Sequence, residues 1–296
     1  MKQSEAEELL ALLPRERTLF TYGKDWYAVA LLQLALRRGH GARPAAFAKL
    51  YDKPRLRAWL GAFGKKSFSA MDLDLLWPEE SETYRLTAGL FSGWAQTSRK
   101  GGKSWNIVLQ MNLNGDDARL METKFPERSE DPFECSIHPI HEGRHRTLAW
   151  ARIDLDWRTG EALIEEIQND RIRDVEWRVN RIRTQKLRTI RLMGREVEAE
   201  FVIDYWERRL RLSRQCWDEA MLCAAIRFIV VELGLRKIYY HSPVSGKYLK
   251  RAGNAPTSIY TDLPRKFCFE KTTEMPEFLG RCGKRRRDLW MHRLCF

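Results

Sequence analysis

The chain has 296 residues, 44% of them hydrophobic, so it is long enough to bury a full core without disulfides or structural metals. Its 52 Lys and Arg residues outnumber its 40 Asp and Glu residues, and the formal net charge at pH 7 is +12. This excess favours polyanionic partners over a purely solubilising role. Nucleic acid is therefore the leading candidate partner, and an acidic protein is the second.

Six cysteines are scattered along the chain without a C-x-x-C pair. Cys216 and Cys223 fall in a helical pattern, where small buried residues are expected. This usage is typical of a reducing compartment, and we expect a cytoplasmic protein. The amino terminus is charged and the longest apolar run, residues 226–233, is too short to span a bilayer, so we expect neither secretion nor membrane insertion.

The first 80 residues predict a set of short helices. Helical spacing covers Ala6 to Leu13, Asp25 to Leu36 and Ser69 to Leu76, and a short pair of helices split by Pro44 and Pro54 lies between them. Two interpretations stay open, a relative of the helix-turn-helix motif and a subdomain that only packs. No pattern singles out a recognition helix.

Further along the chain the apolar period becomes two. Residues 84–96 and 104–113 flank a polar, glycine-containing turn, which indicates a β-hairpin. We expect another turn at residues 114–117. Alternating residues over 148–155 and 162–167 then indicate a second hairpin. The chain therefore carries at least four successive antiparallel strands.

Helical periodicity returns over residues 171–233, as two or three helices broken near Gly194. The last of them, from Trp217 to Leu233, has the apolar stripe of a core-facing helix and ends at Gly234. The chain then continues with shorter elements.

Residues 236–241 and 263–269 each predict a short strand. Together the elements predict an α+β protein, with a helical N-terminal portion followed by a mixed, mostly antiparallel sheet and packing helices. We divide it into a helical subdomain, a core with a basic helical insertion, and a basic tail. Their bounds are 1–80, 81–280 with the insertion at 171–195, and 281–296.

A polar cluster follows the second strand of the second hairpin. Polar side chains at a strand end are typical of binding sites, because the rigid strand fixes groups that the next loop exposes. The cluster consists of Glu166, Gln168, Asn169, Asp170 and Arg171. We take it as the candidate functional site.

Strand alternation assigns sides within this cluster. It places Glu166 and Gln168 on one face and Glu165 on the other. If the first pair faces a cleft, Glu166 is a candidate general base and Gln168 a positioning donor, with Asp170 as a third catalytic candidate. In the alternative interpretation Glu165 is solvated, Glu166 pairs with a nearby arginine, and the group is structural.

A run of the form C-x2-H-x2-H-x3-H precedes this hairpin. Thiolate and imidazole suit zinc, and the short spacings allow convergence in a loop. The run lacks the second pair of a zinc finger, so a polar loop without metal and phosphate contact by the histidines are the alternatives. Its members are Cys135, His138, His141 and His145.

A basic helix is predicted at residues 171–195, which carry eight Arg and one Lys against Asp174 and Glu176, a net charge of +7. An arginine ridge beside Trp177 suits a phosphate backbone. In the alternative interpretation it is a solvated helix paired with acidic stretches. The candidate nucleic-acid contacts are Arg178, Arg181, Arg183, Lys186 and Arg188, with Lys284, Arg285, Arg286 and Arg287 in the tail.

The segment ALIEEIQND, followed after a spacer by WDEAMLCAAIRFIVVELGLRKIYY, resembles a domain of phage and mobile-element polyvalent proteins that carries the strand motif EIQSDW. Asn169 stands at the serine of that motif and Arg171 at its tryptophan. The resemblance implies an association with mobile elements.

The succession of a strand with a polar end, the helix 217–233, the strand 236–241 and the ending SIYTDLPRKFCFEKT resembles the back half of GNAT-type N-acyltransferases. In that fold the loop after the fourth strand holds the pyrophosphate of acyl-CoA at a helix N-terminus. The resemblance implies acetyl-CoA as candidate cofactor. It assigns phosphate contacts to Arg171 and Arg173.

Three functional hypotheses follow. The first is a GNAT-like acyltransferase-type protein with a basic, polyanion-facing surface and with Glu166 as base. The second is a noncatalytic nucleic-acid-binding protein of a mobile element or of a system directed against one. The third is a regulator whose basic helix binds an acidic protein.

Overall fold

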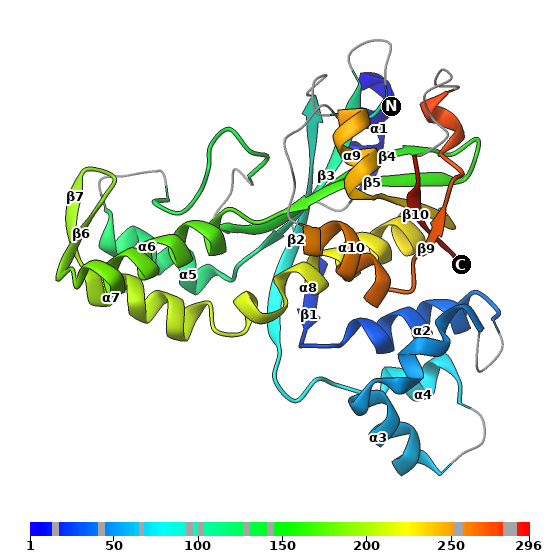
Figure 1. Cartoon of the computed structure of the whole chain (residues 1–296), viewed down its shortest axis with the longest axis horizontal. Coiled ribbons are helices and arrows are strands. Elements are labelled where there is room, and N and C mark those ends of the chain that lie inside the picture. The colour runs from blue at the N-terminus through cyan, green and yellow to red at the C-terminus, as the bar shows by residue number, and fades with distance from the viewer. Residues whose placement is uncertain are drawn as a thin grey trace.

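An eight-stranded sheet crosses the molecule in the order β1-β2-β3-β4-β5-β8-β10-β9 (Figure 1). Neighbouring strands are antiparallel except β5 and β8, which are parallel. The predicted α+β class and the mixed, mostly antiparallel sheet are confirmed. The strands are β1 (Thr18–Tyr22), β2 (Glu82–Ser92), β3 (Trp105–Asn112), β4 (Thr147–Asp156), β5 (Glu161–Gln168), β8 (Lys237–His241), β9 (Glu270–Thr272) and β10 (Met291–Cys295).

The structure is a computed structural model that describes residues 1–13, 18–40, 45–64, 68–92, 97–99, 104–126, 131–140, 145–250, 257–280 and 289–296. A separate two-stranded sheet joins β6 (Thr189–Leu192) and β7 (Arg195–Glu198). The helical segments are α1 (Gln3–Leu12), α2 (Tyr27–Arg37), η1 (Ala45–Asp52), α3 (Pro54–Phe63), α4 (Ala70–Asp74), α5 (Gly115–Lys124), α6 (Arg171–Gln185), α7 (Ala199–Asp204), η2 (Tyr205–Arg209), α8 (Ser213–Arg227), η3 (Phe228–Glu232), α9 (Pro243–Lys250), α10 (Thr257–Lys266) and η4 (Glu277–Leu279).

The first 80 residues contain the predicted helices and, in addition, the strand β1. β1 pairs with β2 at the edge of the sheet, and its buried Phe20 and Tyr22 join the same hydrophobic core as α1 and α2. Thr21 and Thr83, which share a 2.9 Å hydrogen bond across this pair, lie 62 positions apart in the chain. The sequence around β1 carries little strand pattern, because the strand has only five residues and its partner is distant in the chain.

One face of the sheet is apolar, and the other carries many polar side chains beside a small hydrophobic cluster of Leu163, Tyr239 and Met291. On β4, Ala149, Ala151 and Ile153 belong to the main core, against which α8 packs. Trp150 and Arg152 alternate with them and lie on the opposite side. We call this second side the polar face, and it also carries Gln110, Asn112, Gln168 and His241.

Helix α6 leads from the end of β5 into a lobe that projects from the sheet, at the left of Figure 1. We call α5, α6, α7 and the hairpin β6–β7 the α6 lobe. Met193 and Gly194 have φ values of 49° and 83° and form the two-residue turn of this hairpin. The helical insertion predicted at 171–195 is therefore helical to Gln185 and then continues as strand.

Two local predictions are wrong. Residues 114–117 begin α5 instead of a simple turn, because the Asn114 side chain accepts a 3.0 Å hydrogen bond from the Asp116 amide and caps the helix. The strand predicted at 263–269 is largely the end of α10, in which Ile259 and Leu263 are spaced by one helical turn and buried together.

The C-terminal segment is part of the main sheet. β10 inserts between β8 and β9 and pairs antiparallel with both. The tail predicted at residues 281–296 therefore contributes a strand of the sheet over residues 291–295. The basic cluster Lys284, Arg285, Arg286 and Arg287, and also His141, lie outside the described residues.

Candidate functional site at the end of strand β5

A β-bulge in β5 determines where the site's carboxylates lie. Arg152 pairs with Glu166 and the next residue of β4, Ile153, pairs with Ile164, so Glu165 is an extra residue without a partner on β4. Beyond the bulge, the residues of β5 that point to each face of the sheet are shifted by one position. Glu165 and Glu166 therefore both reach the polar face, and the predicted placement of Glu165 on the opposite face is wrong.

Glu165 is fully buried in a hydrogen-bonded group. Its carboxylate accepts from the Ser98 hydroxyl at 2.7 Å and from the Ser98 amide at 2.9 Å, and lies 3.1 Å from Nε2 of His241. The Ser98 hydroxyl is also 2.8 Å from that same Nε2. Nδ1 of His241 is 3.0 Å from Oγ of Ser245 on α9.

This group is not a nucleophilic triad. Ser98 meets the same imidazole nitrogen as Glu165, so it is not on the opposite side of the ring as a triad serine would be. Ser245 is at the other nitrogen, but it is fully buried and its hydroxyl oxygen accepts from the Ser242 amide at 2.9 Å, so it is not placed to attack a substrate. Burial would raise the pKa of Glu165, but His241, Lys250 and Arg152 outweigh it and lower the pKa to about 2. Burial lowers the pKa of His241. The group is built to hold an ionised carboxylate in place.

Glu166 is held between two cations. Its carboxylate is 3.0 Å from both Nε and Nη2 of Arg152 and 3.0 Å from Nζ of Lys250. Burial opposes ionisation, but Lys250 and Arg152 lower the pKa of Glu166 below its usual value. A carboxylate so strongly stabilised as an anion is a poor proton acceptor, so the geometry does not favour the predicted role of Glu166 as general base.

Lys250 fills the junction between the two parallel strands. β5 and β8 pair only as far as Ile164 and Tyr240, although β5 continues to Gln168. Beyond that point the Lys250 ammonium donates to the Glu165 carbonyl at 2.7 Å and to the Tyr260 hydroxyl at 3.1 Å. A side chain of the chain itself therefore replaces the missing strand partner.

An outer cluster lies where β5 ends. Nδ1 of His138 is 2.6 Å from Oδ2 of Asp170, and the Gln168 amide donates to Oδ1 of Asp170 at 2.8 Å. Arg173 donates to the same oxygen at 2.7 Å. Three of the predicted site residues, Gln168, Asp170 and Arg173, thus meet around one carboxylate, and His138 from the loop 131–140 joins them.

The contacts of Asp170 select one histidine tautomer. An ionised carboxylate can only accept, so Nδ1 of His138 carries the proton and Nε2 is left as the basic nitrogen. The 3.2 Å approach of the Gln168 amide to Nδ1 is then a neighbouring contact, because that amide already donates to Asp170. The His138 side chain is 25% exposed.

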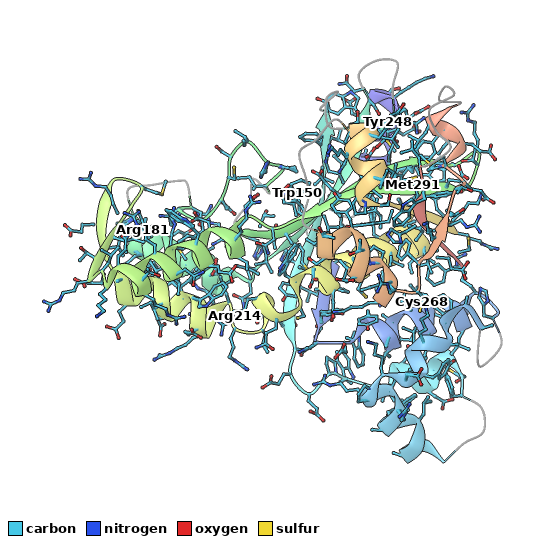
Figure 2. All side chains as sticks on the ribbon, viewed as in Figure 1. Trp150, Arg181, Arg214, Tyr248, Cys268 and Met291 are labelled. Carbon is cyan, nitrogen blue, oxygen red and sulfur yellow. The ribbon has the colours of Figure 1, made fainter. Side chains whose placement is uncertain are left out.

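Trp150 lies beneath this outer cluster on β4, near the centre of the molecule in Figure 2. Its ring is 5.7 Å from the His138 ring. The indole N–H is buried and has no hydrogen-bond partner among the residues that the structure describes. Such a donor is costly to leave unpaired, and it marks a place where a ligand atom can accept.

Arg171 is not available to a cofactor phosphate, contrary to expectation. Its guanidinium is fully buried and lies 3.0 Å from Asp131, 3.4 Å from Glu134 and 3.6 Å from Asp117. It also donates to the Tyr205 hydroxyl at 2.9 Å. Arg171 therefore ties α6 to α5, η2 and the loop 131–140.

The N-terminus of α6 is also occupied. The Asn169 side chain accepts a 2.7 Å hydrogen bond from the Ile172 amide, and the Asp170 carboxylate adds negative charge at the same end. A pyrophosphate at this helix end would find the Ile172 amide already hydrogen-bonded, and the Asp170 carboxylate would repel it. The local geometry does not provide the phosphate site that the GNAT-type resemblance implies.

The α6 lobe carries both paired and unpaired basic residues. Arg178 lies 2.6 Å from Asp174, and Arg183 lies 2.7 Å from Glu207. Arg181 donates to the neutral Gln185 at 3.2 Å. Among the described residues 171–198, the exposed basic residues that form no ion pair are Arg181, Lys186, Arg188 and Arg191.

The remaining metal candidates do not converge. Cys135, His138 and His145 are described, and His138 is engaged by Asp170. Among the described residues, no group of three or more His, Cys, Asp or Glu side chains is arranged to hold a metal ion. The described part of the Cys-His run therefore serves the outer cluster through His138.

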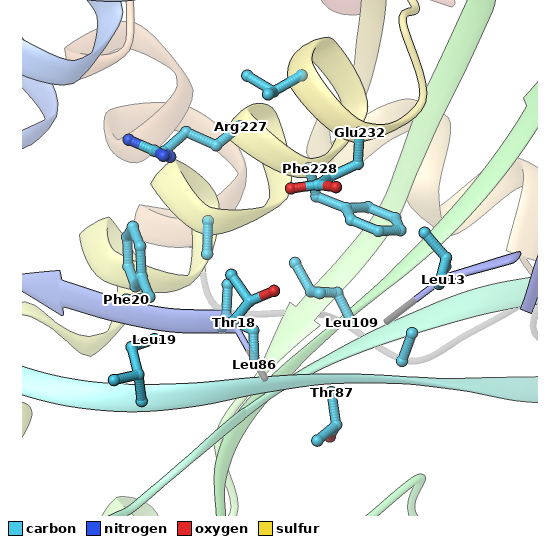
Figure 3. Close-up of a pocket in the computed structure, with 13 residues that line it drawn as sticks. Leu13, Thr18, Leu19, Phe20, Leu86, Thr87, Leu109, Arg227, Phe228 and Glu232 are labelled. Carbon is cyan, nitrogen blue, oxygen red and sulfur yellow. The ribbon is translucent and has the colours of Figure 1, made fainter. Parts of the chain in front are cut away.

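An apolar pocket lies on the other face of the sheet, between β1, β2 and α8 (Figure 3). Leu86, Leu109 and Phe228 line it, with Arg227 and Glu232 as its charged members. Figure 3 shows Thr87 on the far side of its strand, where its hydroxyl donates to Gln110 at 2.8 Å. None of the residues that surround Glu165, Glu166 or Asp170 lines this pocket.

Sequence reasoning missed most of the residues that surround Glu165 and Glu166. Ser98, Lys250 and Tyr260 come from segments that nothing local links to β5, whereas Arg152 is the cross-strand neighbour of Glu166 in the predicted hairpin. His241 closes the strand predicted at 236–241, and a polar residue at a strand end is the one signal that could have found it.

The chain matches no protein-family model, no curated protein and no solved structure. No helix in the described ranges has the length and apolar character needed to cross a membrane.

Proposed function

We propose that this protein binds single-stranded nucleic acid through the exposed side of the α6 lobe. The observation that carries the proposal is the surroundings of Trp177. This indole is 56% exposed, and the guanidinium carbons of Arg178 and Arg181 lie 5.9 Å and 5.7 Å from its ring centroid. An exposed aromatic ring flanked by arginines offers a base a stacking surface and offers the adjacent phosphates a positive field.

The charge on the lobe extends this surface. Arg173, Trp177 and Arg181 are all exposed and spaced by four residues, so they share one side of α6. Lys186, Arg188 and Arg191 follow at the end of the helix and on the adjoining hairpin. Because these last three form no ion pair in the described structure, their charge is free to attract phosphates.

The test is binding of a short, fluorescently labelled single-stranded oligonucleotide of mixed sequence, followed by anisotropy. We expect Trp177→Ala to weaken binding about tenfold or more, since stacking on one aromatic residue contributes about 1–3 kcal/mol per base. Trp77→Ala is the matched control, because Trp77 is 73% exposed and lies in the N-terminal part of the chain. Equal effects of the two variants, or no binding at low salt, would overturn the proposal.

Acyl transfer is the second candidate function. The observation that favours it is the sheet itself, in which the parallel pair β5 and β8 diverges beside two glutamates and is followed by β10 inserted between β8 and β9. In this interpretation Glu166, Gln168 and Asp170 serve the reaction and Arg173 contacts a cofactor phosphate.

Titration with acetyl-CoA under native mass spectrometry tests this second candidate. A saturable mass shift that Arg173→Ala weakens would support it, since the Arg173 side chain is 70% exposed and remains accessible. No bound cofactor at millimolar concentration would remove it. In that case the clusters at the end of β5 would have to serve another reaction or none.

A further inference from the structure

The outer cluster at the end of β5 offers chemistry that nucleic-acid binding alone does not use. His138, Gln168, Asp170 and Arg173 are locked together by contacts of 2.6–2.8 Å around the Asp170 carboxylate. We propose that His138 is a general base and that its substrate is single-stranded RNA held on the α6 lobe. This inference rests on the binding function proposed above and adds a catalytic activity to it.

The geometry around His138 meets the requirements of a general base. The Asp170 carboxylate accepts a 2.6 Å hydrogen bond from Nδ1–H of His138, which leaves Nε2 with its lone pair. Gln168 and Arg173 in turn fix the other oxygen of that carboxylate. With the ring orientation set by this arrangement and a quarter of the side chain exposed, Nε2 is the nitrogen left to act on a substrate.

The same helix connects this base to the proposed binding surface. Asp170 precedes the first turn of α6, and Arg173, Trp177 and Arg181 follow along one side of it. Seven residues of α-helix separate Asp170 from Trp177, which corresponds to about 10 Å. A strand stacked on Trp177 that continues toward the sheet therefore reaches Arg173 and then His138.

RNA is the substrate class that this set of groups fits. Its 2′-hydroxyl is an internal nucleophile, so cleavage needs a base, a cation near the phosphate and a fixed position for the strand. His138 supplies the base, and the 70% exposed Arg173 supplies the cation. The buried indole N–H of Trp150 lies beside the His138 ring and has no partner among the described residues, so it supplies a donor for a substrate oxygen.

The step is a transesterification within the RNA chain. Nε2 of His138 takes the proton of the 2′-hydroxyl, the bond from O2′ to phosphorus forms, and the bond from phosphorus to O5′ breaks. The departing 5′ oxygen takes a proton from water, and the resulting hydroxide takes the proton from the imidazolium. The products are a 2′,3′-cyclic phosphate and a 5′-hydroxyl, and the enzyme is regenerated without any co-reactant.

The experiment uses the full chain and two labelled strands that differ only in their 2′ groups, in the presence of a metal chelator. We expect cleavage of the RNA strand with 2′,3′-cyclic phosphate ends and no cleavage of the all-deoxy strand. RNA that is bound with salt-dependent affinity but stays intact would overturn this inference and leave the binding function standing. Absence of binding would overturn the binding function itself.

Variants separate the proposed base from contaminating nucleases. His138→Gly should reduce the cleavage rate at least 100-fold, with partial recovery on addition of free imidazole, and should retain RNA affinity. His40→Gly is the control, because His40 is exposed and lies after α2. Cleavage that persists in His138→Gly, or fails to respond to imidazole, would refute the assignment.

Asp170 acts through His138 and is a positioning residue. Asp170→Asn keeps the size of the side chain but removes the charge that orients the ring. We expect kcat to fall about tenfold with KM and the thermal unfolding midpoint unchanged. A change in KM or in the unfolding midpoint without a change in kcat would instead indicate a purely structural role for Asp170.

Discussion

Lys250 donates a 2.7 Å hydrogen bond to the backbone carbonyl of Glu165, a residue 85 positions earlier in the chain. The bulge in β5 leaves Glu165 without a partner on β4, and pairing with β8 has already stopped at Ile164. The buried ammonium therefore satisfies a carbonyl that the sheet does not. It also neutralises Glu166, so one side chain closes the junction between the parallel strands.

Removing this ammonium is expected to destabilise the fold. Lys250→Met preserves most of the apolar stem, but it leaves the Glu165 carbonyl unpaired and Glu166 with Arg152 alone. We expect the free energy of unfolding to fall by about 3 kcal/mol, as for other broken buried ion pairs. Lys247→Met on the same helix, at an exposed position, should change it by less than about 0.5 kcal/mol. Urea denaturation of both variants measures the difference.

Glu165 should make stability depend on pH in the acidic range. Its pKa is lowered from 4.5 to about 2 in the folded protein, so the ionised form stabilises the fold at and above pH 4.5. This contribution, about 3 kcal/mol, is lost as the pH falls from about 4.5 through 2. Denaturation at a series of pH values should show a flatter dependence for Glu165→Gln. Parallel curves for the two proteins would contradict the assignment.

Arg171 and Arg173 should differ strongly although they are two residues apart. Arg171→Met leaves Asp117, Asp131 and Glu134 buried without their common cation, and we expect a loss of about 3–5 kcal/mol. Arg173→Met removes an exposed pair and should cost less than about 1 kcal/mol.

If Arg171→Met does not fold, Arg171→Lys provides the comparison. Lysine keeps the positive charge but lacks the planar guanidinium that can bind several carboxylates at once. The variant should therefore fold, with a stability between those of the wild type and Arg171→Met. Similar stabilities for the substitutions at the two positions would show that the burial of Arg171 does not determine its role.

The salt dependence of nucleic-acid binding should report individual phosphate contacts. Each substitution that removes one such contact should decrease the slope of log K against log salt by about 0.7 on single strands. We expect this decrease for Arg181→Ala and for Arg188→Ala. Arg158→Ala is the control, because Arg158 is 89% exposed but already paired with Asp156 in the β4–β5 turn. A slope that is the same in all variants would exclude the α6 lobe as the binding surface.

Much of the fold could be predicted because its signals are local. Both hairpins, the core helix α8 and the strand β8 follow from apolar periodicity over 5–15 neighbouring residues. The predictions failed where a short apolar run fits both the helical period and the strand period. Leu263 and Phe267 are one turn apart on α10 and its end, yet the run around them also alternates like a strand.

What the sequence by itself determined is the polar cluster at the end of β5, the net positive charge of α6 and the alternation of core-facing apolar residues on β4. What only the tertiary structure decided is which of these charges remain free. The bulge directs Glu165 to the polar face, and Lys250 neutralises Glu166. Asp170 binds His138, which lies 32 positions earlier in the chain. The physical reason is that a charge is defined by residue type, whereas its burial and its partner depend on segments far apart in the chain that meet only when the sheet and α6 assemble.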